Sequence, residues 1–97
     1  MNKLDEISRQ RKKAHARLLK LDSKVYKAFL DMESAAYSDG ALPAKAKELI
    51  AIGISVVINC ESCMQWHIEQ AARHGASMEE VLEAVEVGIE KIGRAHV

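Results

Sequence analysis

Two cysteines, Cys60 and Cys63, are the side chains of this 97-residue chain best suited to chemistry. They stand at C-x-x-C spacing on the first turn of an expected helix, close enough to close a small disulfide ring. The partial positive charge of a helix N-terminus favours the reactive thiolate there. His67 follows Cys63 by four residues, so its imidazole shares a helix face with that thiol and can take the thiol proton. This spacing predicts a redox-active pair.

Glu48 is the only acid between Asp39 and Glu61, and eleven residues separate it from Cys60. If its helix packs against the cysteine helix, the carboxylate can accept a proton from His67 directly or through water. The sequence thus predicts a proton relay beside the sulfur pair.

The two thiols are not equivalent. The helix terminus favours Cys60 as the more reactive thiol, whereas the histidine four residues away favours Cys63. We expect Cys63, because an aligned base acts on one particular thiol.

Two other functions use the same segment. Cys60, Cys63, His67 and His74 offer two sulfurs and two imidazoles, which are zinc ligands, although Glu48 would be better placed than His74 as the fourth. Alternatively, the chain is a non-catalytic oligomeric assembly module, because a domain this small leaves apolar helix faces for a neighbouring subunit to bury.

The elements that must position these residues read as helices. Periodic apolar residues predict a helix over 4–20, followed by a second helix that Asp22 or Ser23 caps. A third helix is expected over 43–58, with Pro43 in its first turn. Although this segment is rich in β-branched residues, its length and its proline favour a helix that is buried on most sides.

Two more helices are expected after residue 58, and the first of them carries the candidate cysteines. Asn59 is expected to cap a helix over 60–74 that Gly75 closes. Ser77-Met78-Glu79-Glu80 is a capping box, which predicts the start of a fifth helix. The fold class is therefore all-α, a compact bundle of about five helices.

The composition excludes several classes of protein. Basic and acidic residues balance at 14 each and the pI is 6.9, which argues against a nucleic-acid or membrane-surface protein. The longest run without a charged residue, Asn, Gln or His is 49–58, ten residues, about half of a bilayer span. No export signal is apparent, so a cytoplasmic location is expected. Residues 1–20 carry seven basic and two acidic groups. We expect this segment to be a basic helix exposed to solvent.

We expect residues 1–90 to form one domain, with the basic helix 1–20 and a core over 40–90. The tail 91–97, KIGRAHV, resembles the translation of a common sequencing adapter. We therefore expect that tail to be non-native and the natural protein to continue beyond Glu90.

The whole pattern is E-x11-C-x2-C-x3-H, with Lys-Glu-Leu-Ile-Ala around the acid and Ala-Ala-Arg-His-Gly-Ala-Ser-Met-Glu-Glu-Val after the histidine. It resembles the AhpD-like (alkylhydroperoxidase D-type) branch of the carboxymuconolactone decarboxylase family over about residues 40–90. The resemblance implies an all-helical homo-oligomer, commonly a trimer or hexamer, with peroxidase or disulfide-reductase activity and no organic cofactor.

The resemblance also implies roles for individual residues. Cys63 would attack the hydroperoxide, Cys60 would resolve the product, and Glu48 and His67 would relay protons. Reduction would come from a dithiol donor, such as a lipoyl domain or a small redox protein. Some members carry a further histidine where this chain has Ser62, which implies a shorter relay here.

Overall fold

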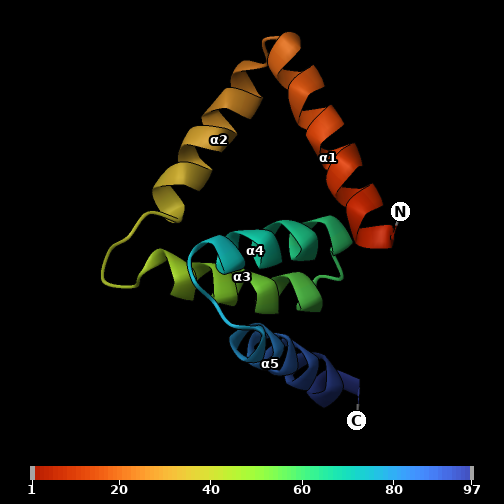
Figure 1. Cartoon of the computed structure of the whole chain (residues 1–97), viewed down its shortest axis with the longest axis vertical. Coiled ribbons are helices and arrows are strands. Elements are labelled where there is room, and N and C mark those ends of the chain that lie inside the picture. Colours follow the sequence, from red (N-terminus) through yellow and green to blue (C-terminus); the bar gives the residue numbers. More distant parts are fainter. Residues whose placement is uncertain (1, 97) are drawn as a thin grey trace. The chain divides into compact units, whose positions relative to one another are not determined.

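The computed structural model describes residues 2–96, which form five α-helices and no strand (Figure 1). The expected all-α fold class is confirmed. The helices are α1 (Lys3–Lys20), α2 (Lys24–Ala36), α3 (Ala44–Val57), α4 (Glu61–Arg73) and α5 (Met78–His96). The chain divides into two compact units, residues 1–38 and 39–97, which are described separately. That residues 1–90 form one domain stays a prediction.

The first unit is a pair of helices, and a side chain caps the N-terminus of each. The Asn2 side chain accepts a hydrogen bond from the Asp5 N–H at the start of α1, and Ser23 caps α2 through the Tyr26 N–H. Asp22 does not cap α2, because it adopts a left-handed conformation with φ of 58°. A hydrogen bond between His15 and Tyr26 joins the two helices.

The second unit is built around α3, which packs against both α4 and α5 (Figure 1). Its buried centre takes one apolar side chain from each of these helices: Ile52, Ala71 and Val81. Pro43 is the N-cap of α3 rather than its first helical residue, and the Asp39 carboxylate accepts the Ala44 N–H at 2.7 Å.

The expectation that α3 is buried on most sides is wrong for one side. Ile50, Ile54 and Val57 are each about half exposed, at 52%, 54% and 47%. The helices α4 and α5 cover two sides of α3. Within this unit, neither helix covers these three side chains.

The helices α3 and α5 approach each other closely at two glycines. A Cβ atom on Gly88 would lie 2.8 Å from the Gly53 carbonyl oxygen and 2.8 Å from Cβ of Val56. Because a methyl group does not fit at such distances, this crossing requires glycine at residue 88.

The predicted capping box starts α5. The Ser77 hydroxyl accepts the Glu80 N–H at 3.1 Å, and the Glu80 carboxylate accepts the Ser77 N–H at 2.9 Å. Lys45 of α3 forms an ion pair with Glu80 at 3.0 Å. The Ser77 backbone hydrogen bond, and then Lys45, hold the pKa of the Glu80 carboxyl below its usual value.

The helix α5 continues through residues 91–96, and Val97 lies outside the described residues. The non-native origin of residues 91–97 stays a prediction. No helix within residues 2–96 is long and apolar enough to cross a membrane.

Candidate active site

One residue, Cys60, both ends α3 and begins α4. At the end of α3, Asn59 adopts a left-handed conformation with φ of 53°, and its N–H donates to the Val56 carbonyl. The Cys60 N–H then donates to the Ser55 carbonyl at 3.0 Å. These two bonds are the Schellman pattern, which satisfies the last carbonyl groups of a helix.

The expected N-cap of α4 was Asn59, and this prediction is wrong by one residue. Cys60 is the N-cap, and its Sγ accepts the Cys63 N–H at 3.3 Å. Asn59 cannot cap α4 because its left-handed backbone is already used to end α3, and an N-cap residue needs extended dihedrals. Cys60 has those dihedrals, with φ of −104° and ψ of 97°.

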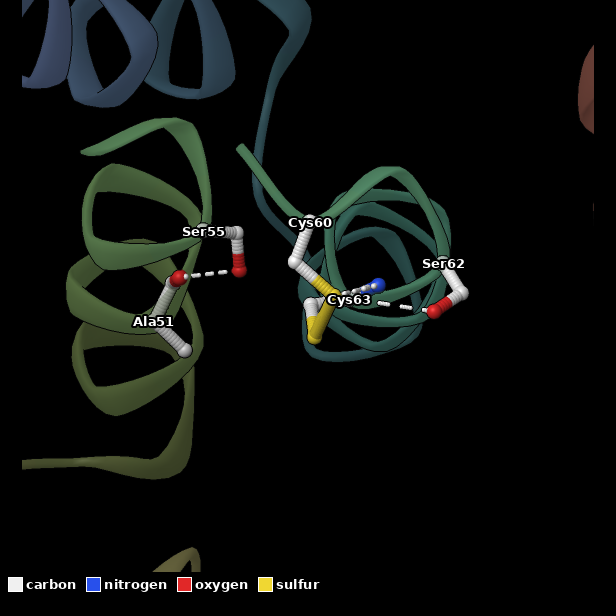
Figure 2. Close-up of a disulfide and its surroundings, with 5 residues drawn as sticks. All are labelled: Ala51, Ser55, Cys60, Ser62 and Cys63. Atoms are coloured by element: carbon white, nitrogen blue, oxygen red, sulfur yellow. Dashed lines mark hydrogen bonds between the residues drawn. A yellow bond between two sulfur atoms is a disulfide. The ribbon is translucent and has the colours of Figure 1, made fainter. Parts of the chain in front are cut away.

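A disulfide joins Cys60 and Cys63, whose Cα atoms are 5.2 Å apart. Figure 2 shows it on the side of α4 that faces α3, with the Ser55 hydroxyl directed into the interval between the two helices. That hydroxyl is buried and donates to the Ala51 carbonyl at 2.7 Å. Ser62 Oγ lies 3.6 Å from Cys60 Sγ on the other side.

Glu48 and His67 form the second part of the site. Glu48 Oε2 lies 3.0 Å from His67 Nδ1, and the side chains are only 4% and 13% exposed. A carboxylate this buried needs a hydrogen-bonding partner, since an unpaired charge in the interior is costly. Donation from Nδ1–H to the Glu48 carboxylate would fix both the tautomer and the orientation of the His67 ring.

The helix periodicity connects the two parts. Glu48, Ala51 and Ser55 recur at spacings of three and four residues and are all buried on α3. Cys63 and His67 are four residues apart on α4, so they share a face of that helix. The Glu48–His67 hydrogen bond joins these two faces.

Among the four predicted site residues the structure shows two pairs, the Cys60–Cys63 disulfide and the Glu48–His67 hydrogen bond. The catalytic roles of all four residues remain predictions. His74, considered as a zinc ligand, is the exposed C-cap of α4. Among the side chains that the structure describes, those of residues 2–93, no three His, Cys, Asp or Glu lie close enough to hold a metal ion. With both sulfurs in a disulfide, neither is a thiolate ligand in this state.

Sequence reasoning missed Ser55 and misread Asn59. The signal for Asn59 was available, because asparagine is among the few residues other than glycine that tolerate a left-handed conformation. Nothing in the sequence singled out Ser55. Its carbonyl group accepts the Cys60 N–H, and its side chain lies on the buried face of α3.

Residues 23–92 match the model of the Carboxymuconolactone decarboxylase family. The chain belongs to this family. A carboxymuconolactone decarboxylase family protein from Legionella pneumophila, solved in its apo form, is 28% identical with a TM-score of 0.87. That comparison covers 94% of this chain and 81% of the other.

A second structure of the family comes from Thermotoga maritima, and a part in an antioxidative response has been suggested for that protein. It is 29% identical with a TM-score of 0.73, over 86% of this chain and 70% of the other. These similarities agree with the AhpD-like branch of the carboxymuconolactone decarboxylase family.

Curated relatives include an uncharacterised protein of Cupriavidus necator, 42% identical over 68% of this chain. Another, uncharacterised protein 4 in the cox locus of Paracoccus denitrificans, is 38% identical over 65%. The matched segment spans a little over half of each relative, 58% and 57%.

Proposed function

We propose that this carboxymuconolactone decarboxylase family protein is a thiol-dependent peroxidase and disulfide oxidoreductase of the peroxiredoxin type. One observation carries the proposal: a disulfide-forming cysteine pair starts α4, and a buried Glu48–His67 hydrogen bond lies on the face of that helix that carries Cys63. The pair supplies two electrons and the imidazole supplies a route for protons.

The cycle has three balanced steps. The Cys63 thiolate attacks a hydroperoxide, ROOH, and takes up one oxygen while a proton completes the alcohol ROH, which leaves Cys63 as a sulfenic acid. The Cys60 thiol then attacks the sulfenic sulfur, and water leaves as the disulfide forms. Finally a dithiol donor reduces the disulfide by exchange, so that both thiols return and the donor becomes a disulfide.

His67 is the proposed base and acid of this cycle. Its Nε2 takes the Cys63 proton before the attack and returns it to the leaving alkoxide. Glu48 is a positioning residue, because its bond to Nδ1 fixes the orientation and tautomer of the ring.

Cys60 is the proposed resolving thiol. The Cys63 N–H that points at its sulfur, together with the N-terminus of α4, stabilises negative charge on Cys60 Sγ. Such stabilisation makes Cys60 a good leaving thiolate when the donor opens the disulfide at Cys63. The same geometry therefore serves resolution and recovery.

The proposed partners follow from the chemistry. They are a hydroperoxide, a dithiol donor such as a lipoyl domain or small redox protein, and further copies of the chain in a trimer or hexamer. The cycle needs no organic cofactor. Because the dithiol must be restored after each turnover, we propose a reducing compartment, the cytoplasm.

Thiol titration tests the proposal. Reduced protein is treated with one equivalent of cumene hydroperoxide, and thiols are counted before and after. We expect a loss of two thiols per chain and a Cys60–Cys63 link in the peptide map. In Cys60→Ser, a dimedone adduct on Cys63 should accumulate, because no second thiol resolves the sulfenic acid.

Two outcomes contradict the proposal. If Cys63→Ser leaves peroxide consumption and dithiol exchange unchanged, the chain is a non-catalytic assembly module. If the reduced protein binds zinc stoichiometrically and its thiols then ignore peroxide, the site is a metal site. Ser62→Ala is the matched control, since it changes a neighbour of Cys60 without removing a thiol.

A further inference from the structure

Ser62 lies between the two cysteines in the chain, and its side chain contacts one of the reacting sulfurs. Its Oγ atom is 3.6 Å from Cys60 Sγ, on the side of α4 that faces away from α3 (Figure 2). Hydrogen bonds to sulfur are longer than those to oxygen, because sulfur is the larger atom. A sulfur in a disulfide carries no hydrogen, so the Ser62 hydroxyl is the donor and Cys60 Sγ is the acceptor.

The same sulfur accepts a second hydrogen bond, from the backbone. The Cys63 N–H donates to Cys60 Sγ at 3.3 Å, at the start of α4. Two donors therefore converge on Cys60 Sγ, one from a side chain and one from the main chain. Among the residues that the structure describes, none donates a hydrogen bond to Cys63 Sγ. The two sulfurs of the disulfide thus differ in how well their surroundings stabilise negative charge.

This difference matters when the disulfide is reduced. An attacking thiolate forms a bond to one sulfur, and the other sulfur leaves with the electron pair of the S–S bond. A thiol of lower pKa leaves faster, so attack is favoured where the departing sulfur is the better stabilised one. Hydrogen bonds to an ionised group are stronger than those to a neutral one, so both donors strengthen as charge develops on Cys60.

We propose that the Ser62 hydroxyl stabilises the Cys60 thiolate and thereby directs the dithiol donor to Cys63. The inference rests on the proposed disulfide exchange and assigns a further residue to it. One donor thiolate attacks Cys63 Sγ, a mixed disulfide forms, and the Sγ–Sγ bond breaks with its electron pair on Cys60. The second donor thiolate attacks the donor sulfur of the mixed disulfide, which releases Cys63 and closes the donor disulfide. The two protons of the donor thiols end on the two cysteines.

Ser62 can be changed without disturbing the packing of the helices. Its side chain is exposed, so Ser62→Ala removes the hydroxyl without opening a cavity. Ser62→Thr keeps a hydroxyl at the same position of the side chain. Ser55→Ala is the matched control, because it removes a hydroxyl of the facing helix that donates to the Ala51 carbonyl.

The charged groups around Cys60 are the same in every variant of this comparison. Glu61 follows Cys60 on α4, and α3 contributes Glu48, which is paired with His67. A difference between the variants at residue 62 therefore comes from the hydroxyl and not from these charges.

The ultraviolet absorbance of the thiolate measures the charge on Cys60 directly. In a Cys63→Ser background Cys60 is the only thiol of the chain, so the titration reports that group alone. We expect Ser62→Ala to raise the titration midpoint by about half a pH unit, because a hydrogen bond to the charged form is lost. Ser62→Thr should restore the midpoint, and Ser55→Ala should leave it unchanged. A midpoint that does not rise in Ser62→Ala overturns the proposed role.

Trapping of the mixed disulfide tests the site of attack. Glutathione is the probe, because a single thiol stops the exchange at the mixed disulfide. The oxidised protein is treated briefly with glutathione, the freed thiol is blocked with N-ethylmaleimide in acid, and tandem mass spectrometry locates both groups. We expect glutathione on Cys63 and N-ethylmaleimide on Cys60. Ser62→Ala should lower this preference about threefold, and Ser62→Thr should restore it. Glutathione mainly on Cys60 in the wild type overturns the proposed direction.

Neither measurement uses a peroxide, so their outcomes are separate from those of the peroxidase test. Thiols that ignore peroxide, with the expected responses at residue 62, overturn the peroxidase activity and support the role of Ser62 in exchange. Two thiols lost to peroxide, with Ser62→Ala like the wild type in both measurements, overturn the role of Ser62 alone. A disulfide that glutathione does not open overturns the exchange together with this role. Because Ser62→Ala keeps both sulfurs, it still has two thiols to lose in the titration with peroxide.

Discussion

The Glu48 carboxylate of α3 lies 3.0 Å from Nδ1 of His67 on α4, and both side chains are largely withdrawn from water. The bond crosses between two helices and joins residues nineteen positions apart. It therefore serves two purposes, because it satisfies a buried acid and holds an imidazole on the helix face that carries Cys63.

Glu48→Gln should slow oxidation of the thiols by peroxide about tenfold without unfolding the protein. The amide keeps the size of the side chain and one acceptor oxygen, but it loses the charge that stabilises a protonated imidazole. Stopped-flow thiol oxidation across pH measures the effect. Glu69→Gln, the same change at an acid of α4 that lies outside the Glu48–His67 pair, should not alter the rate. Loss of folding in Glu48→Gln would instead make the carboxylate structural.

His67→Ala should lower the free energy of unfolding by about 1–3 kcal/mol, because it leaves a buried carboxylate without its partner. Adding Glu48→Gln to this variant should recover part of the loss, since the charge is then gone. Urea unfolding of the two single variants and the double variant measures both effects. Strictly additive losses would contradict an energetic link between the two side chains.

Asn59→Val should cost about 1–2 kcal/mol of stability, since a β-branched residue fits poorly at φ of 53°. Asn59→Gly should be tolerated, because glycine is the usual residue at this position of the Schellman pattern. Chemical unfolding compares the two variants with the wild type. Equal losses in both would show that the asparagine side chain, rather than the backbone conformation, is what matters.

Gly88→Ala should destabilise the second unit by about 1–3 kcal/mol, because the added methyl group meets the backbone of α3 at 2.8 Å. Gly93→Ala is the matched control on the same helix, since a Cβ there meets nothing within 4 Å. Alanine has the higher helix propensity, so Gly93→Ala should be neutral or stabilising. Thermal unfolding of both variants at one concentration makes the comparison, and equal melting temperatures would contradict the close crossing.

Glu80→Gln should reduce stability at neutral pH and have no effect in strong acid. The folded-state pKa of Glu80 lies below the usual 4.5, so ionised Glu80 stabilises the folded state above that value. This contribution is lost as the pH falls through the lowered pKa. Urea midpoints at about pH 7 and about pH 2 should differ between variant and wild type only at the higher pH. A difference that persists in acid would point to packing instead of charge.

Much of the fold was predictable because its signals are local. Ser77 and Glu80 stand at capping-box spacing, and the structure forms both of their hydrogen bonds. The Glu48–His67 contact was predictable as well, because an isolated acid on a helix that is becoming apolar needs a partner across the helix interface.

Other features could not be predicted because they depend on packing between helices. The left-handed Asn59 moved the cap of α4 to Cys60, since the end of α3 and the start of α4 share one short junction. The close contact of Gly53 with Gly88 depends on where α3 and α5 cross, which no local pattern in either helix encodes.

Cys60 both closes α3 and caps α4, and this limits the length of the chain between the two helices. With no spare residue between the last turn of α3 and the first turn of α4, one inserted residue would rotate everything downstream by about 100°. Such an insertion would carry His67 away from Glu48 while leaving C-x-x-C intact. Chain length at this junction therefore decides whether His67 meets Glu48.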